Sequence, residues 1–363
     1  MKLLKKIYTL GVFLLLFAFN SEAQTGGDNT FEFLNIPPTA RLSSLGGNNV
    51  SIFDYDPSLV YANPALMHSY MDNMLHLSYN NYIADINFAY ASYIKDFENI
   101  GTFGGSIYFL NYGKFIHADE TGAILGNFTA SDYVFDVSYN RPLMERLYAG
   151  ASLKFIYSSM FTYFSSGLAA DLGLHYFSGD SLFSAGLAFK NLGSQLKPYY
   201  LGNYEHLPYD LQIGFTQGLK HAPFRFSLTF QDLLNWNLRY DSPLDQNYYT
   251  DINQSQSDSL NFTQKVNNFF NSAGKAGDEL LRHAIVGVEI VPSENFYISL
   301  GFNYRRRAEL AISTKPGLIG FSIGAGVKVS KFHISYGFAN YHIAGKSHLV
   351  SLSTNLNSFY RKS

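Results

Sequence analysis

The side chains that could do chemistry in this sequence are charged and histidine residues scattered through segments that are otherwise apolar or small. His175, His283 and His333 are examples, yet the sequence contains no His-x-x-x-His or Glu-x-x-His spacing that would present two ligands to one metal ion. Cysteine is absent, which removes thiolate ligands and cysteine nucleophiles. There is no phosphate-binding loop and no dinucleotide fingerprint. We therefore expect a non-enzymatic protein without cofactor or metal, whose histidines form hydrogen bonds inside the fold.

The charged residues of these segments share one side of a two-residue alternation. Their neighbours one position away are large and apolar, so each segment has an apolar face and a face of charged, polar or small residues. Strands with two such faces separate lipid from a lumen that can pair or solvate charge. We predict that these charges fill a narrow barrel as paired groups, and they are Asp136, Lys154, Asp171, Lys190, Arg225, Glu289 and Lys328.

The alternation runs through residues 73–363 and predicts about fourteen strands. Aromatic residues make up 17% of the chain and charged residues 15%, whereas soluble domains carry about 25% charged residues. After the N-terminal region, no segment approaches the roughly 18 uninterrupted apolar residues of a spanning helix. A net charge of −2 argues against a basic nucleic-acid-binding protein. The sequence therefore predicts an all-β, transmembrane antiparallel β-barrel.

The connections between the predicted strands are of two kinds. Alternate ones are short, and the others include long segments at residues 114–126, 191–206, 235–280 and 305–316. Because outer-membrane barrels have short periplasmic turns and longer outer loops, we expect the long connections to be extracellular. Glycines on the lumen side leave room for a strand kink or a ligand cavity, and examples are Gly173, Gly301 and Gly324.

The N-terminal region predicts export and a plug. Residues 1–23 form a signal peptide, with basic residues up to Lys6, an apolar stretch to Phe19 and small residues at Ser21 and Ala23, after which we expect cleavage. This predicts an outer-membrane location for the barrel. Residues 24–72 do not alternate and are rich in turn-forming residues. They are also too apolar for a solvated tail, so we expect a plug in or under the periplasmic mouth.

Part of this segment resembles a known family. Residues 31–47 (FEFLNIPPTARLSSLGG), followed by Asp54, Asp56 and residues 63–66 (NPAL), are similar to the opening of the PorQ family, outer-membrane components of the type IX secretion system in Bacteroidetes. More distantly, the chain resembles PorV and the FadL-like transporters. The resemblance implies a FadL-like barrel of fourteen strands that anchors a cell-surface attachment complex. It would hold a PorZ-like protein near the sortase PorU and the shuttle PorV, in contact with outer-membrane lipid and lipopolysaccharide.

The FadL-like layout leaves a second function open, the transport of a hydrophobic small molecule across the outer membrane. Such a transporter would need a lateral kink in a strand and an apolar cavity between plug and wall.

Two segments are candidate interaction surfaces. In the long connection 235–280, four apolar residues recur at helical spacing, and this face would dock a partner or, equally well, cap its own barrel. They are Phe262, Val266, Phe269 and Phe270. At the outer end of a predicted strand, three guanidinium groups could grip lipopolysaccharide phosphates or simply form a basic rim beside the anionic leaflet. They belong to Arg305, Arg306 and Arg307.

Overall fold

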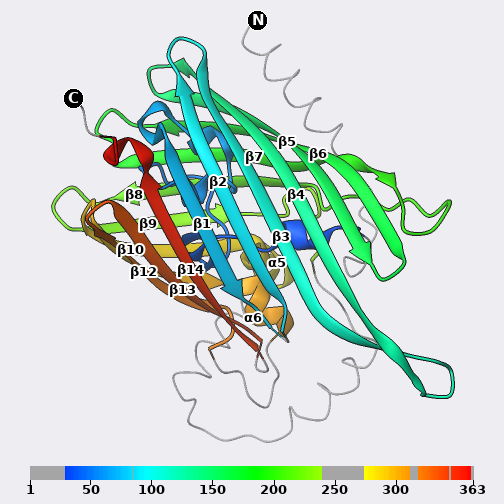
Figure 1. Cartoon of the computed structure of the whole chain (residues 1–363). Helices are drawn as coiled ribbons and strands as arrows, with labels where there is room; N and C mark the ends of the chain where they lie inside the picture. Colours follow the sequence, from blue (N-terminus) through cyan, green and yellow to red (C-terminus); the bar gives the residue numbers. More distant parts are fainter. Residues whose placement is uncertain (1–28, 84, 239–273, 311–317, 343–344, 361–363) are drawn as a thin grey trace, which may run out of the picture.

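The computed structural model describes residues 29–83, 85–238, 274–310, 318–342 and 345–360, and its strands form one closed antiparallel barrel (Figure 1). Each strand pairs with its neighbours in the chain, and β1 pairs with β14 to close the sheet. The prediction of an all-β barrel of fourteen strands is confirmed. The strands are β1 (Met74–Asn81), β2 (Asn87–Phe97), β3 (Gly101–Ala118), β4 (Ile124–Met144), β5 (Leu147–Met160), β6 (Tyr163–Phe177), β7 (Phe183–Lys197), β8 (Asp210–Gly218), β9 (Phe224–Phe230), β10 (Ala284–Ser293), β11 (Phe296–Asn303), β12 (Phe321–Val329), β13 (Phe332–His342) and β14 (Gly345–Asn355).

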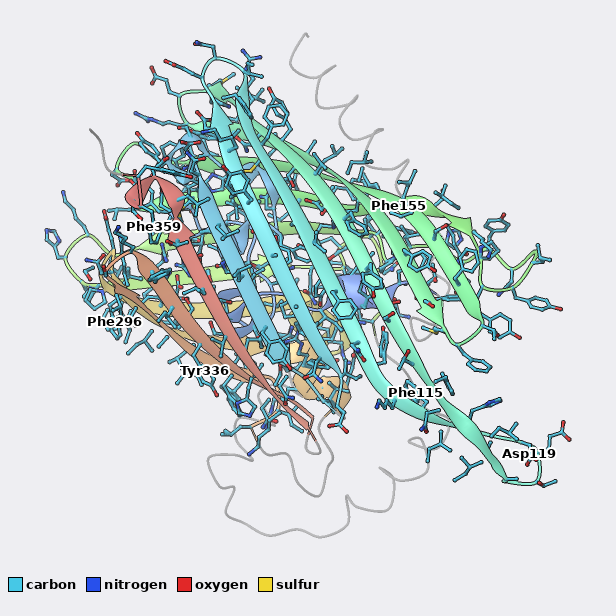
Figure 2. All side chains as sticks on the ribbon, in the orientation of Figure 1. Phe115, Asp119, Phe155, Phe296, Tyr336 and Phe359 are labelled. Carbon is cyan, nitrogen blue, oxygen red and sulfur yellow. The ribbon has the colours of Figure 1, made fainter. Side chains whose placement is uncertain are left out.

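The two-residue alternation gives the barrel two different surfaces. In β12, Ser322 and Gly324 are buried against the lumen, whereas Phe321 and Ile323 each leave 47% of their surface exposed on the outside. The same outward pattern of apolar and aromatic side chains covers the wall, as Figure 2 shows for Phe155, Phe296 and Tyr336. A surface this apolar is stable against hydrocarbon rather than water.

The two ends of the barrel carry different connections. At one end, which we call the turn end, the strands are joined by tight turns such as residues 98–100 and 330–331, and the short 3-10 helix η5 (Leu356–Ser358) follows β14. The opposite end, the loop end, carries α5 (Gly274–His283), α6 (Tyr304–Leu310) and the β3–β4 hairpin, which projects well past the rim (Figure 1). Among the described residues, no helix has the length and apolar character needed to cross a membrane.

Two predicted connections are partly strand. β3 continues to Ala118 and β4 begins at Ile124, so most of the predicted connection 114–126 belongs to the projecting hairpin. Similarly, β7 runs to Lys197, past the predicted start of a connection at residue 191. The alternation fades in these stretches because a two-stranded ribbon beyond the barrel has no lumen on one side. Cross-strand contacts stabilise the ribbon instead, such as that of Phe115 with Phe128, whose ring centres are 5.2 Å apart.

Residues 29–72 lie inside the barrel. Asn29 forms a bridge with His206 at the loop end, and Asp72 accepts a hydrogen bond from Lys95 at the turn end, so the segment runs the length of the lumen instead of staying at one mouth. It reaches that far because its apolar residues need the whole interior for burial. Its short helices are η1 (Glu32–Asn35), α2 (Ala40–Ser44), η2 (Pro57–Leu59), η3 (Pro64–Leu66) and η4 (Ser69–Met71).

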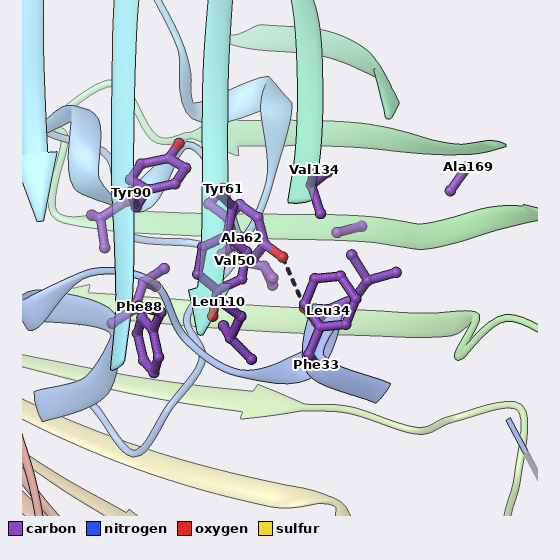
Figure 3. Packing of buried hydrophobic residues seen from close by; sticks show 14 of the residues in the cluster. Phe33, Leu34, Val50, Tyr61, Ala62, Phe88, Tyr90, Leu110, Val134 and Ala169 are labelled. Atoms are coloured by element: carbon purple, nitrogen blue, oxygen red, sulfur yellow. Dashed lines mark hydrogen bonds between the residues drawn. The ribbon is translucent and has the colours of Figure 1, made fainter. Parts of the chain in front are cut away.

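The hydrophobic core of the protein lies between this segment and the wall (Figure 3). Leu34, Val50 and Tyr61 of the segment pack with Phe88 of β2 and other inward residues of β2 to β6. Tyr61 Oη donates a hydrogen bond to the Leu34 carbonyl at 2.9 Å, so that the buried hydroxyl is satisfied (Figure 3). The barrel is therefore filled by its own N-terminal chain.

The lumen glycines serve this filling. A Cβ at Gly173 would lie 2.0 Å from Asn63 Oδ1, one at Gly301 2.1 Å from the Gly46 nitrogen, and one at Gly324 2.5 Å from Ser44 Cβ. Our expectation that these positions leave room for a kink or cavity was wrong. They allow the backbone of the N-terminal segment to approach the wall closely.

Candidate functional site

A buried ion network joins the N-terminal segment to the wall, and we call its five residues, Arg41, Asp54, Asp56, Arg225 and Glu289, the latch network. Thr39 caps α2 by accepting a hydrogen bond from Leu42 N, and Arg41 follows in the first turn. The Arg41 guanidinium contacts Asp54 at 2.7 Å, Asp56 at 3.0 Å and Glu289 of β10 at 3.0 Å. One guanidinium thus holds α2 and the loop of Asp54 and Asp56 against the wall.

Arg225 of β9, the cross-strand partner of Glu289, completes this network. Its Nη2 lies 2.6 Å from Glu289 Oε2 and 3.1 Å from Asp54 Oδ2, so the two guanidiniums share two carboxylates. The Arg41 guanidinium also lies over the Tyr297 ring at 4.5 Å. Arg41 and Glu289 are 3% and 1% exposed, which places the centre of the network out of contact with water.

The electrostatics of this network favour its charged form. Burial alone would raise the pKa of Asp54, but the charges of Arg41 and Arg225 outweigh burial and hold that pKa well below its usual range. Burial would lower the pKa of Arg41, yet the surrounding carboxylates raise it well above the usual value. Paired charges of this kind stabilise one arrangement of the segment in the lumen.

A second buried cluster lies across β5, β6 and β7. Lys154 Nζ contacts Asp171 at 2.5 Å and donates to Asn191 Oδ1 at 3.0 Å. The pairing of β6 with β7 is irregular beside Asp171, and Asn191 adopts a φ of 56° that turns its N–H toward the Asp171 carboxylate at 2.7 Å. Lys154 and Lys190 both lie over the Tyr61 ring, at 5.1 and 4.8 Å.

These two clusters account for most of the predicted lumen charges. Arg225 and Glu289 lie in the latch network, Lys154, Asp171 and Lys190 in the second cluster, and Asp136 accepts a hydrogen bond from Ser138 nearby. Lys328 differs, since it is exposed near the turn end of β12. Sequence reasoning did not identify Arg41, Asp54 and Asp56 as a functional group. The available signal was the presence of these charged residues in a non-alternating segment with many apolar residues.

At the loop end, a cavity of about 510 Å³ lies between the N-terminal segment and the wall, and we call it the mouth cavity. Apolar side chains such as Leu34, Ile36 and Leu207 form part of its lining, together with Lys190 and Asp210 from β7 and β8. Most of the lining residues are nevertheless polar or charged, whereas a hydrophobic transporter was expected to have an apolar cavity. Its volume falls in the range of about 300–1,000 Å³ that is typical of small-molecule sites.

The predicted arginine cluster lies on α6, beside the mouth cavity. Arg305 donates to Asp232 Oδ2 at 2.6 Å and to Glu309 Oε1 at 2.7 Å, and Arg306 donates to the Gly46 carbonyl at 3.1 Å. Two of the three guanidiniums therefore hold loop-end elements and the N-terminal segment together. Arg307 packs near Gly320, with its Cβ 3.1 Å from the position that a Gly320 Cβ would occupy.

The apolar residues predicted to dock a partner, Phe262, Val266, Phe269 and Phe270, lie outside the described residues. The described end of that connection is α5, which contacts α6. Arg282 of α5 pairs with Asp278 at 2.8 Å. His283 Nδ1 and Nε2 lie 2.8 and 3.1 Å from the Gln231 and Trp236 carbonyl oxygens, which accept from a protonated ring nitrogen. A histidine role in hydrogen bonding is also seen for His175, which meets the Ser51 carbonyl at 3.1 Å.

Residues 320–324 read Gly-Phe-Ser-Ile-Gly, which matches the Gly-x-Ser-x-Gly pattern of hydrolase nucleophiles. That pattern requires a sharp turn from a strand into a helix, whereas here a turn leads into β12. Ser322 Oγ donates to the Ser44 carbonyl at 2.9 Å and accepts from Gly46 N at 3.0 Å. Its hydroxyl binds the N-terminal segment and is not oriented as a nucleophile.

No family model and no curated protein matches the chain. Solved structures do resemble it. The deltaS2S3 mutant of the monoaromatic hydrocarbon channel TodX superposes with a TM-score of 0.53 at 12% identity, covering 88% of this chain and 99% of that one. The Ralstonia pickettii toluene transporter TbuX gives a TM-score of 0.50 at 12% identity, and the superposition covers 90% of this chain and 100% of that one.

The Pseudomonas putida toluene transporter TodX gives a TM-score of 0.50 at 10% identity, covering 86% of this chain and 95% of that one. At these identities the likeness concerns the fold and does not carry a substrate with it. The chain therefore has a FadL-like fold, a closed antiparallel barrel of fourteen strands preceded by an N-terminal segment.

Proposed function

We propose that this protein is an outer-membrane barrel that admits a small hydrophobic molecule at its loop end. The observation that carries the proposal is the mouth cavity of about 510 Å³, which lies where a molecule arriving from outside would first meet the barrel. Its apolar residues would hold the body of the guest, and its polar residues would bind an attached polar group. The apolar outer wall supports residence in a membrane.

The filled lumen supports a selective route over an open pore. Residues 29–72 occupy the interior, and the latch network fixes them to β9 and β10. A passive porin needs a continuous aqueous channel, so that function is disfavoured. TodX and TbuX are named as toluene transporters, and small aromatic hydrocarbons are for that reason the first compounds to test on this chain.

Saturable binding and uptake test this function. Purified barrel would be titrated with labelled toluene and with a labelled fatty acid, and uptake would be followed in proteoliposomes. Asn35→Trp and Gln231→Trp fill the mouth cavity from residues that line it, whereas Asn295→Trp adds the same side chain at the turn end. We expect binding to fall in the first two variants and to persist in the third. Uptake that does not saturate and is unchanged by all three substitutions would contradict the proposed transport function.

The second candidate is the anchor of a type IX secretion attachment complex, as the resemblance to PorQ implies. The projecting β3–β4 hairpin favours it, because the hairpin carries apolar side chains far from the barrel wall. Ile116 is 66% exposed, Ile124 70% and Leu125 62%, and Asp119 marks the tip in Figure 2. Exposed apolar residues on a two-stranded ribbon are suited to a protein partner.

A crosslinked pull-down with mass spectrometry tests the anchor. Tagged barrel would be isolated from outer membranes in three forms: intact, lacking residues 235–280, and with residues 114–128 replaced by an Asn-Gly turn. An anchor recovers a PorZ-like protein, together with PorU and PorV, in the intact form and loses them in at least one shortened form. Recovery of the barrel alone in every form would leave transport as the function.

Both functions rest on export of the chain. We propose that residues 1–23 are removed as a signal peptide and that the mature protein reaches the outer membrane. Mass spectrometry of the purified barrel should find Gln24 as its first residue. Retention of the apolar N-terminal stretch in the mature protein would contradict this.

A further inference from the structure

The outer wall carries an apolar groove of about 480 Å³ where β14, β1, β2 and β3 lie side by side. Strand register explains it. One row of outward side chains crosses the four strands as Val350, Tyr79, Ala89 and Phe109. The next row toward the turn end is Leu352, Leu77, Ala91 and Ile107.

Both rows have alanine at the β2 position, between large side chains. Tyr79 and Leu77 stand on one side, 54% and 43% exposed, and Ile107 on the other is 49% exposed. The two alanines therefore form the floor of a trough that runs along β2. An unfilled trough of this kind deprives its walls of dispersion contacts, so a hydrocarbon occupant is favoured.

The row next toward the loop end changes character. It reads His348, Asn81, Asn87 and Asn111, so the groove stops at a band of polar side chains. Tyr79 Oη and Asn81 Nδ2 both donate to Asn87 Oδ1, at 2.9 and 3.0 Å, which closes the top of the trough. Lys346 lies two residues beyond His348 on β14 and is exposed. The Asn81 and Asn87 amides bond within the protein, and His348 Nδ1 lies 2.7 Å from Tyr336 Oη. The ammonium group of Lys346 is therefore the feature of the cap that matches an anionic head, above a trough that matches a hydrocarbon chain.

We propose that this groove binds one acyl chain of an anionic membrane lipid, whose head group lies beside His348 and Lys346. The proposal rests on the membrane location in the proposed function, but not on transport or anchoring. It assigns the outer face of β14 to β3, which is separate from the mouth cavity, as a lipid site. Among the described residues that line the groove, none is charged, so the specificity for an anionic lipid comes from the cap.

Native mass spectrometry tests the site. The full barrel would be equilibrated in detergent with dimyristoyl phosphatidylglycerol or dimyristoyl phosphatidylcholine, and retained lipid would be counted. The double variant A89F/A91F fills the trough. A325F is the matched control, because Ala325 is an exposed alanine on the outer face of β12 between Ile298 and Tyr336. Wild type and A325F should each retain one phosphatidylglycerol, and A89F/A91F should lose it.

The head group is tested separately. Wild type should retain phosphatidylglycerol in preference to phosphatidylcholine, and K346Q should remove that preference while keeping a bound lipid. Equal retention by wild type and A89F/A91F would overturn the groove as the site, and equal retention of both lipids by wild type would overturn the anionic assignment. Heat-modifiable gel mobility checks that every variant is folded. This assay measures lipid bound to the isolated barrel and does not depend on the mouth cavity. Loss of the lipid site would therefore leave the proposed solute binding intact, and loss of solute binding would leave the lipid site intact.

Discussion

Replacing Arg41 with methionine should release residues 29–72 from the lumen while the barrel wall stays folded. Arg41 is 3% exposed and neutralises carboxylates on Asp54, Asp56 and Glu289. Methionine keeps a similar apolar volume but removes the charge. Three acidic groups would then share the single guanidinium of Arg225, which contacts only two of them.

The expected cost follows from the geometry. Removing one partner of a buried ion pair costs about 3–5 kcal/mol. Asp54 is 24% exposed and keeps its contact with Arg225 at 3.1 Å, which places the cost toward the lower end of that range. Arg41 takes no part in the strand pairing of the wall, so we expect the loss to concern docking of the segment.

Limited proteolysis of detergent-solubilised barrel measures this release. Cleavage within residues 29–72 should accelerate roughly a hundredfold or more, since each 1.4 kcal/mol is about tenfold when opening is faster than cleavage. Gel mobility would verify that the wall remains closed. Planar bilayers give a second readout, in which the variant conducts and wild type does not.

A matched control is Arg282→Met. Arg282 pairs with Asp278 at 2.8 Å on α5, with side chains 15% and 21% exposed, and such a helical pair is worth about 0.3–0.5 kcal/mol. The double variant Arg41→Met/Glu289→Gln removes a charge of each sign and should recover part of the lost protection. Cleavage of Arg41→Met at the rate of wild type or of Arg282→Met would refute the reasoning.

Three further predictions concern the same interior. The folded-state pKa of Asp54 is depressed, so its contribution to docking is present above the unfolded pKa of about 3.9 and is lost as pH falls toward the folded value. Protection of residues 29–72 from protease should therefore drop below about pH 4. The drop should be smaller in Asp54→Asn than in wild type. Gly301→Ala would place Cβ 2.1 Å from the Gly46 nitrogen and should cost about 1–3 kcal/mol in urea unfolding, whereas Gly105→Ala, whose nearest atom is 4.0 Å away, should be neutral. Lys154→Met should destabilise the folded protein by about 3–5 kcal/mol, because it leaves the buried Asp171 carboxylate without its partner. The double variant Lys154→Met/Asp171→Leu should destabilise it by much less. Similar losses in both variants would contradict a paired role for Lys154.

Much of the wall could be predicted from sequence because its signal is local. Side chains along a strand between lipid and lumen must alternate between apolar and polar or small types. The residue type at a position such as Phe321 or Ser322 therefore indicates whether it faces lipid or lumen. Charges obey the same rule, since Lys154 and Glu289 could be tolerated only inside. Where neither environment imposes alternation, as in the β3–β4 hairpin past Gly113, the predicted connection of residues 114–126 is partly strand.

The candidate sites were harder to predict because they combine distant segments. The latch network joins Arg41 to Glu289, and Gly301 is needed because Gly46 passes over it. Nothing in the short motif around Ser322 shows that its hydroxyl binds Ser44 and Gly46 instead of serving as a nucleophile. The partner-docking prediction for Phe262 and its neighbours stays a prediction.

By itself, the sequence determined the class of fold, the facing of the strand residues and the separation of an N-terminal segment from the strands, since each depends on neighbours a few positions apart. Only the tertiary structure decided which strands meet, that the segment fills the lumen from end to end, and where cavities remain. The groove on the outer wall is the clearest case: Ala89 and Ala91 are ordinary strand residues until the register sets them between Leu77, Tyr79, Ile107 and Phe109. Register is a property of paired strands, and hydrogen bonds between residues far apart in the chain fix it.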